Sequence, residues 1–205
     1  TFGAGLLARV AEAPPDELGA ALQSLADKEF IQEEAIYPES EYVFRHPLTQ
    51  EVAYRSQLAE ARRRAHARAA AALQGPSDRE LDAAASAAVV AHHLEHAGEH
   101  LAAARLRMGA ARWFISRDAR AARDHLERAW ELLGASAETP EADAPRLTVC
   151  SDLIALQLRT GVSLDEVARL FERGCEIARR RSDKGALALL YGRYAGATLM
   201  SGRPI

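Results

Sequence analysis

The chain has little of what defines the more specialised protein classes. Its 205 residues include only 2 cysteines, 8 prolines and 13 glycines, which excludes a disulfide framework, a collagen and a low-complexity chain. No run approaches the roughly 18 apolar residues of a membrane span, and the first residues lack the pattern of an export signal. Because 26 basic side chains face 29 acidic ones, the net charge of −3 attracts neither nucleic acid nor an anionic membrane. We expect a globular, cytoplasmic protein with no membrane partner and no direct nucleic-acid partner.

Sequence motifs for catalysis are also missing. There is no G-x-x-x-x-G-K-[ST] loop to hold phosphates, no G-x-S-x-G nucleophile turn and no H-E-x-x-H metal motif. No cysteine or serine is matched by spacing to a histidine and an acid. The sequence therefore predicts no catalytic residues, no bound metal and no cofactor within this chain.

Residues 1–30 carry the pattern of two short helices. A stripe at residues 6–10 ends at a pair of prolines, and the second helix opens with Asp16 and Glu17, which suit the positive end of a helix dipole. Its leucines recur at i, i+4 and i+7, a spacing that predicts one buried face: Leu18, Leu22 and Leu25.

A β-hairpin and a third helix follow. Apolar pairs at residues 30–31 and 36–37 flank a polar stretch, residues 38–40 supply a turn, and residues 42–46 alternate along the chain, which predicts two paired strands. Pro47 suits the first position of a helix, which we expect to run through Leu48, Val52 and Leu58 and to end at Gly75. Helix, helix, hairpin is the order of a winged helix, so residues 1–75 are predicted to form that domain.

Residues 76–205 predict helices alone. Alanines at helical spacing allow close helix packing, and residues 113–133 match tetratricopeptide spacing. The pattern of residues 161–164 recurs weakly at residues 202–205. We therefore expect an array of tetratricopeptide-like helical repeats. A linker is expected at residues 134–145. The predicted helices are 81–97, 99–116, 118–133, 146–160, 163–181 and 184–201. The fold class is thus mainly α, with one small hairpin.

One segment carries a family resemblance. The stretch YVFRHPLTQEVAY, from Tyr42 to Tyr54, together with Glu29-Phe30-Ile31, Arg62 to Arg64 and His66, resembles bacterial signal-transduction ATPases with numerous domains. These include nucleotide cyclase-associated proteins and large LuxR-type activators. In such proteins a P-loop ATPase module precedes a winged helix and tetratricopeptide-like repeats. The resemblance covers residues 1–133 well, and its most specific part is residues 44–48.

The resemblance implies a regulatory role without catalysis in this segment. We expect a piece of a longer ATPase of the kind that includes nucleotide cyclase fusions. In it, the winged helix docks on an upstream ATPase module, and the repeats bind a protein or small ligand. ATP or ADP with Mg²⁺ would belong to the parent protein. By the resemblance, His46 holds the diphosphate of ADP in the closed state, and its place beside a helix N-terminus suits an anion. The alternative is that the His46 side chain only hydrogen-bonds the next turn.

Two other functions, DNA binding and metal-dependent catalysis, fit the sequence less well. A DNA-binding winged helix would need a basic second helix, whereas residues 16–29 are mainly acidic. A metal-dependent enzyme could use His92, His93, His96 and His100, but Gly98 interrupts that face and the simpler hypothesis is packed or surface histidines. We further expect Cys150 and Cys175 to be buried thiols, and Arg45 and the arginine runs 62–64 and 179–181 to be solvated.

Overall fold

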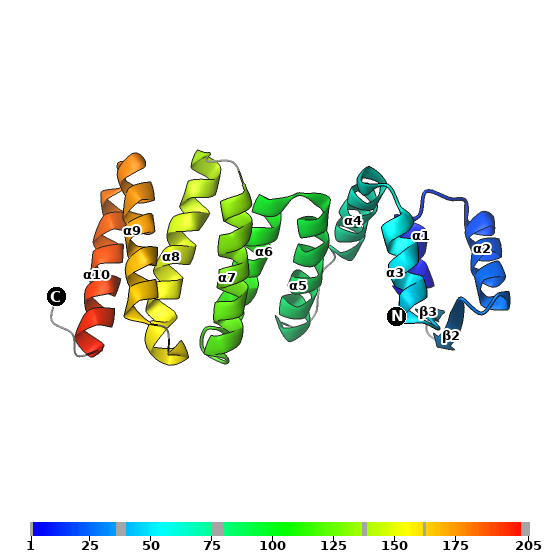
Figure 1. Cartoon of the computed structure of the whole chain (residues 1–205), viewed down its shortest axis with the longest axis horizontal. Coiled ribbons are helices and arrows are strands. Elements are labelled where there is room, and N and C mark those ends of the chain that lie inside the picture. Colours follow the sequence, from blue (N-terminus) through cyan, green and yellow to red (C-terminus); the bar gives the residue numbers. More distant parts are fainter. Residues whose placement is uncertain (1, 36–39, 75–79, 137–138, 162, 202–205) are drawn as a thin grey trace. The chain divides into compact units, whose positions relative to one another are not determined.

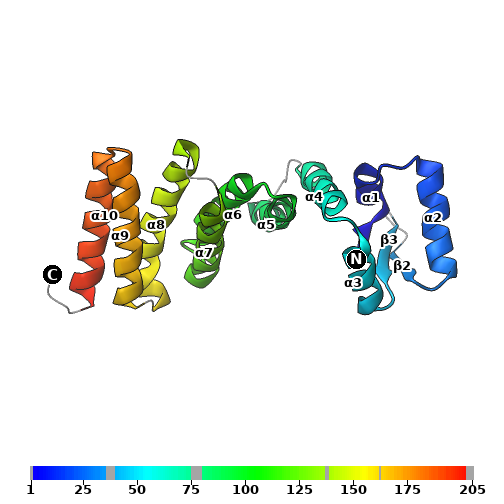
Figure 2. The ribbon, with the colours of Figure 1, turned by 45° about the horizontal axis from the view of Figure 1, so that its top comes forward.

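The computed structural model describes residues 2–35, 40–74, 80–136, 139–161 and 163–201. It is mainly helical, with one small antiparallel sheet, as the sequence predicts (Figures 1 and 2). The chain forms two compact units, one of residues Thr1–Pro76 with His92–Gly98, and one of Ser77–Ala91 with Glu99–Ile205. The predicted domain boundary at 75–76, the end of the third helix at Gly75, the turn at 38–39 and the recurrence at 202–205 lie outside the described residues.

The sheet of the first unit has three strands. The predicted hairpin is confirmed: β2 (Ile31–Ala35) pairs antiparallel with β3 (Glu41–Phe44), with Ile31 opposite Phe44. A strand that the sequence did not predict, β1 (Phe2–Gly3), pairs with the other edge of β3. The Phe2 ring stacks on Tyr42 at 5.8 Å between ring centres, so this strand is held by aromatic contact as well as by backbone hydrogen bonds.

The two predicted N-terminal helices are present as α1 (Ala4–Val10) and α2 (Pro15–Asp27). Pro15 occupies the first turn of α2, where a missing N–H costs nothing. Of the three leucines predicted to share a buried face, Leu22 is buried, Leu18 is partly buried and Leu25 is 40% exposed. The predicted face is therefore shorter than the helix, because α2 contacts the strand β2 along only part of its length.

The predicted third helix is two helices, α3 (Pro47–Ser56) and α4 (Ala59–Leu73). Gln57 and Leu58 adopt extended backbone between them. The break is stabilised by Arg62, which donates from Nη1 to the carbonyl oxygens of Tyr54, Arg55 and Gln57. The Tyr54 carbonyl also accepts from the backbone N–H of Gln57, so the guanidinium adds to the hydrogen bonds that close the end of α3.

The second unit is a row of antiparallel helices. It contains the first part of α5 (Glu80–Ala97), then α6 (His100–Phe114), α7 (Ala119–Ala135), α8 (Pro140–Thr160), α9 (Leu164–Arg180) and α10 (Lys184–Met200). From α6 onward each helix packs on the next, and α8 also packs on α10. Gly98 and Gly161 end their helices with φ of 87° and 72°, which glycine adopts without a steric penalty.

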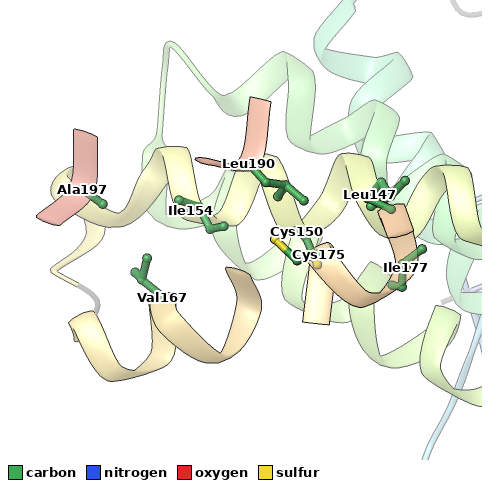
Figure 3. Close-up of a cluster of buried hydrophobic side chains, with 9 residues drawn as sticks. Leu147, Cys150, Ile154, Val167, Cys175, Ile177, Leu190 and Ala197 are labelled. Atoms are coloured by element: carbon green, nitrogen blue, oxygen red, sulfur yellow. The ribbon is translucent and has the colours of Figure 1, made fainter. Parts of the chain in front are cut away.

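The core of this unit lies between α8, α9 and α10 (Figure 3). Its buried members are Leu147, Cys150, Ile154, Val167, Cys175, Ile177, Ala178, Leu190 and Ala197. Alanines that the sequence analysis assigned to close helix contacts are also buried at the α6–α7 interface, including Ala103, Ala111, Ala122 and Ala129. Small side chains let these helices approach closely, which the spacing predicted.

The predicted linker 134–145 is wrong in its second half. Helix α8 begins at Pro140 and contains Pro145, a residue that normally ends a helix because it lacks an N–H and its ring crowds the preceding turn. The first turn is fixed by tertiary contacts instead. Asp143 is 5% exposed and bonds Arg146 on α8 and Arg180 on α9, so the start of α8 is held by its neighbours despite the proline.

Candidate functional site

His46 lies at the junction between the hairpin and α3. It is the N-cap residue of α3, with extended backbone at φ −129° and ψ 126°, as the following proline requires. Its carbonyl oxygen accepts from the backbone N–H groups of Thr49 at 3.0 Å and Gln50 at 3.4 Å. The imidazole is exposed and forms no capping hydrogen bond, so the alternative in which the side chain bonds the next turn is not what the structure shows.

The apolar residues of α3 are on the surface. Leu48 is 78% exposed, Val52 is 68% exposed and Leu58, after the helix, is 79% exposed. The sequence predicted a helix through these three residues; α3 ends at Ser56, and all three side chains are exposed. Leu48 and Val52 are four residues apart, so they share one side of α3 in the first two turns after His46. We call Leu48, Val52 and His46 the α3 surface.

Arg45 is exposed to solvent, as expected, and also forms an ion pair at the surface. Its Nη1 lies 2.9 Å from Glu29 Oε2, and its backbone N–H donates to the Phe30 carbonyl. Glu29 adopts a left-handed conformation, with φ of 61°, where α2 turns into the hairpin. The ion pair therefore joins the end of that turn to the end of β3, next to His46.

A histidine cluster lies in the same unit. His66 on α4 meets three histidines of α5, with ring centres 6.3 Å from His92, 5.1 Å from His93 and 4.8 Å from His96. The Nδ1 atoms of His66 and His93 are 3.0 Å apart, and His66 Nε2 lies 3.1 Å from the Tyr54 hydroxyl of α3. His100, which the sequence grouped with the others, is separated from them by the helix break at Gly98 and lies on α6.

The environment of His66 favours the neutral ring. Burial, and then the charges of His96, His93, His92 and Arg62, lower the pKa of His66 to about 4. Burial, and then His92 and His96, lower the pKa of His93 as well. No group of three or more histidine, cysteine or acidic side chains in the described part of the chain is arranged to hold a metal ion.

The second unit has a groove lined by α7, α8 and α9. A cavity of about 530 Å³ and a smaller one of about 90 Å³ adjoin each other and share Trp130 and Arg173. Leu153 and Leu170 line the larger cavity with Trp130. None of these residues was predicted from the sequence. The signal was present, because Trp130 and Leu170 follow the 3.6-residue spacing of their helices, which is typical of partly buried side chains.

Both ends of this groove are bridged by ion pairs. At one end Arg123 of α7 holds Glu127 on its own helix at 2.5 Å and Glu166 of α9 at 2.7 Å. At the other end Arg146 of α8 donates to Asp143 at 3.1 Å and to the Leu133 carbonyl of α7, while Arg180 of α9 meets the same Asp143 at 2.7 Å. The groove therefore has apolar residues together with charges of both signs in its lining: Glu127, Glu131, Glu166, Arg169 and Arg173 line the larger cavity, and Arg146, Arg173, Arg180 and Glu176 line the smaller one.

The arginine run 179–181 is part of this architecture. Its side chains are exposed, as expected, and two of them also bond α8: Arg181 donates to the Pro140 carbonyl at 2.7 Å and Arg180 bonds Asp143. Both contacts join the end of α9 to the start of α8, so the positive charges lie where the helix dipole of α9 favours them.

The two cysteines are buried free thiols, as predicted. Burial raises the pKa of the Cys150 thiol to about 12 and also raises that of Cys175. A thiol that stays protonated at neutral pH is a poor nucleophile and a poor metal ligand, so these two cysteines serve packing.

Comparisons with known proteins give one relative. The chain is 32% identical over 166 residues to a protein of Rhizobium meliloti whose name describes it as uncharacterized; the match covers 80% of this chain and 16% of that protein. No protein-family model matches the chain, and no solved structure matches it. Across the described helices, none is both long and apolar enough to cross a membrane.

Proposed function

We propose that this chain is a non-catalytic regulatory segment of a larger bacterial signalling ATPase. Its first unit acts as a winged helix that docks on a nucleotide-binding module of the same polypeptide. Its second unit acts as a tetratricopeptide-like repeat array that binds a protein or small ligand. The match covers only 16% of the length of the Rhizobium meliloti relative, which supports a place for this segment within a longer protein.

The α3 surface is the observation that carries the docking role. Two exposed apolar side chains on one side of α3 leave apolar area in water beside an exposed imidazole at the helix N-terminus. Covering two such side chains is worth about 1.5–3 kcal/mol each at full burial. The N-terminus of α3 favours an anion through the positive end of its helix dipole, although Pro47 has no N–H and the N–H groups of Thr49 and Gln50 bond the His46 carbonyl. The first turns of α3 therefore offer both an apolar surface and a place for a negative charge.

Docking of this kind acts as a two-state switch. ADP held partly by His46 favours the closed arrangement, and exchange to ATP or a ligand on the repeats favours the open one. Such control requires that each ligand binds the two states with different affinity, since equal affinity shifts no equilibrium. The groove between α7 and α9 is the surface that we assign to the partner of the repeats, because it combines the partly buried ring of Trp130 with charged side chains of both signs.

The test is ADP release from the full-length protein. Loss of a hydrogen bond to a charged phosphate costs about 1.5–3 kcal/mol, so His46→Ala is expected to speed ADP release roughly ten- to one-hundred-fold. His100→Ala is the matched control, because it removes a histidine that lies on α6 outside the first unit. Unchanged ADP release in His46→Ala contradicts the role of His46.

Two observations distinguish the regulatory role from the alternative of DNA binding. The first is the upstream sequence, which is expected to contain the G-x-x-x-x-G-K-[ST] loop that the regulatory role requires. A DNA-binding winged helix instead retards a duplex at low salt and loses it steeply as salt rises. The exposed acids of α2, including Asp16 and Glu17, argue against that result.

A further inference from the structure

We propose that His66, His92, His93 and His96 form a proton-sensitive contact that holds the end of α5 against α4 at neutral pH and releases it in mild acid. The contact lies within the first unit, to which His92–Gly98 belong. It is independent of the nucleotide role of His46, which lies on another helix and is not among its residues.

The hydrogen bond between His66 and His93 requires that at least one of the two rings is neutral. With 3.0 Å between the Nδ1 atoms of His66 and His93, one nitrogen must donate its proton and the other must accept it. If both rings are protonated, two N–H groups face each other at that distance and the hydrogen bond is lost. The stacked ring of His96 at 4.8 Å then adds a further charge of the same sign.

The surroundings of His66 are mainly cationic or neutral. Arg62 shares its helix, the Tyr54 hydroxyl meets it from α3, and His92, His93 and His96 meet it from α5. Glu95 lies between the last two histidines in the sequence and forms an interaction of its own. Each proton that binds to one imidazole therefore raises the cost of the next.

The direction of the pH effect follows from the lowered pKa values. A histidine that has a pKa near 6.5 when released and about 4 in the contact binds protons preferentially in the released form between those pH values. The contact is therefore complete above pH 6.5 and weakens as the pH falls toward 4. Each pKa unit corresponds to a tenfold preference, which solvent screening reduces for a ring that is only partly buried. We expect a change of about tenfold between pH 7 and pH 5.

Hydrogen exchange on the 205-residue chain tests this proposal. After correction for the intrinsic exchange rates, the protection of amides 92–97 is expected to fall about tenfold from pH 7 to pH 5. In His66→Gln, which keeps a polar side chain that cannot titrate, protection is expected to be the same at both pH values. His100→Gln is the matched control and is expected to keep the full pH response.

Several results overturn the proposal. These are pH-independent protection in the unaltered chain, an unchanged pH response in His66→Gln, or loss of protection spread evenly over α6 to α10. Loss of protection at pH 7 on addition of EDTA also overturns it, because the cluster would then be a metal site. If His66→Gln does not fold, His93→Gln and a nuclear magnetic resonance titration of the unaltered chain replace it. In that titration a His66 ring with a pKa near 6.5 contradicts the proposal.

Discussion

Removing the charge of Asp143 tests whether one buried carboxylate fixes the start of α8. In Asp143→Asn the shape of the side chain is kept, but Arg146, which is 6% exposed, loses its charged partner. Breaking a buried ion pair by removing one partner costs about 3–5 kcal/mol, since the remaining charge stays in a poorly solvated place. Because Asn keeps one acceptor oxygen and Arg180 is partly exposed, we expect the lower end, about 3 kcal/mol.

The dependence of this effect on pH is set by the pKa of Asp143. Burial alone would raise that pKa, but the hydrogen bonds and charges of Arg180 and Arg146 outweigh burial and hold it below the ordinary value. A carboxyl with a lowered pKa contributes stability that is present above its unfolded pKa and is lost as the pH falls through its folded pKa. The difference between Asp143→Asn and the unaltered chain is therefore expected to be full at pH 7 and to shrink below about pH 4.

Urea denaturation followed by far-ultraviolet circular dichroism measures both effects. The matched control is Glu176→Gln, which removes the exposed ion pair with Arg173 at 3.5 Å and should change the free energy of unfolding by less than about 0.5 kcal/mol. If the two substitutions cost the same at pH 7, or if the cost of Asp143→Asn persists unchanged at acid pH, the assignment of stability to the charge of Asp143 is refuted.

Three further substitutions test local packing, helix propensity and capping in the second unit. Gly174→Ala places a Cβ 3.0 Å from Leu190 Cδ1 in the packed core, so we expect a loss of about 1 kcal/mol in the free energy of unfolding. Gly109→Ala on α6, which meets no atom within 4 Å, should instead gain up to about 1 kcal/mol from helix propensity, and equal thermal shifts would refute this reasoning. Asp118→Ala removes the acceptor for the backbone N–H groups of Arg120 and Ala121 and should cost about 1 kcal/mol by urea titration; no loss would show that the cap contributes nothing.

Local patterns in the sequence predicted the elements that local forces decide. The helix after Pro15, the hairpin between Ile31 and Phe44 and the helix break at Gly98 follow from proline geometry, strand alternation and the left-handed turn that glycine permits. The strand at Phe2 escaped prediction, because two residues carry no periodicity and the pairing depends on an edge of β3 that exists only after folding.

The errors arose where distant side chains override local preference. Pro145 predicts a break, yet Arg180 is 37 residues away from Asp143 in the sequence and holds the first turn of α8 in place. Arg62 ends α3 by bonding carbonyls five to eight residues before it, which no helical periodicity encodes. The histidine cluster combines both cases. Spacing predicts that His92 and His96 share a face of α5, but only the packing of α4 adds His66.

The exposed stripe of α3 has a different cause from these errors. Leu48 and Val52 have the spacing of a buried face, and the second unit buries residues with that pattern, such as Leu126 and Leu133 of α7. In the first unit the side of α3 that carries Leu48 and Val52 remains exposed. A periodic apolar face left in water costs free energy that a partner surface can recover, so the pattern is explained if α3 packs against something other than its own unit. Under the proposed docking role, the nearby imidazole of His46 lies at the edge of that interface, so a change in the charge of a bound nucleotide is expected to alter the free energy of docking.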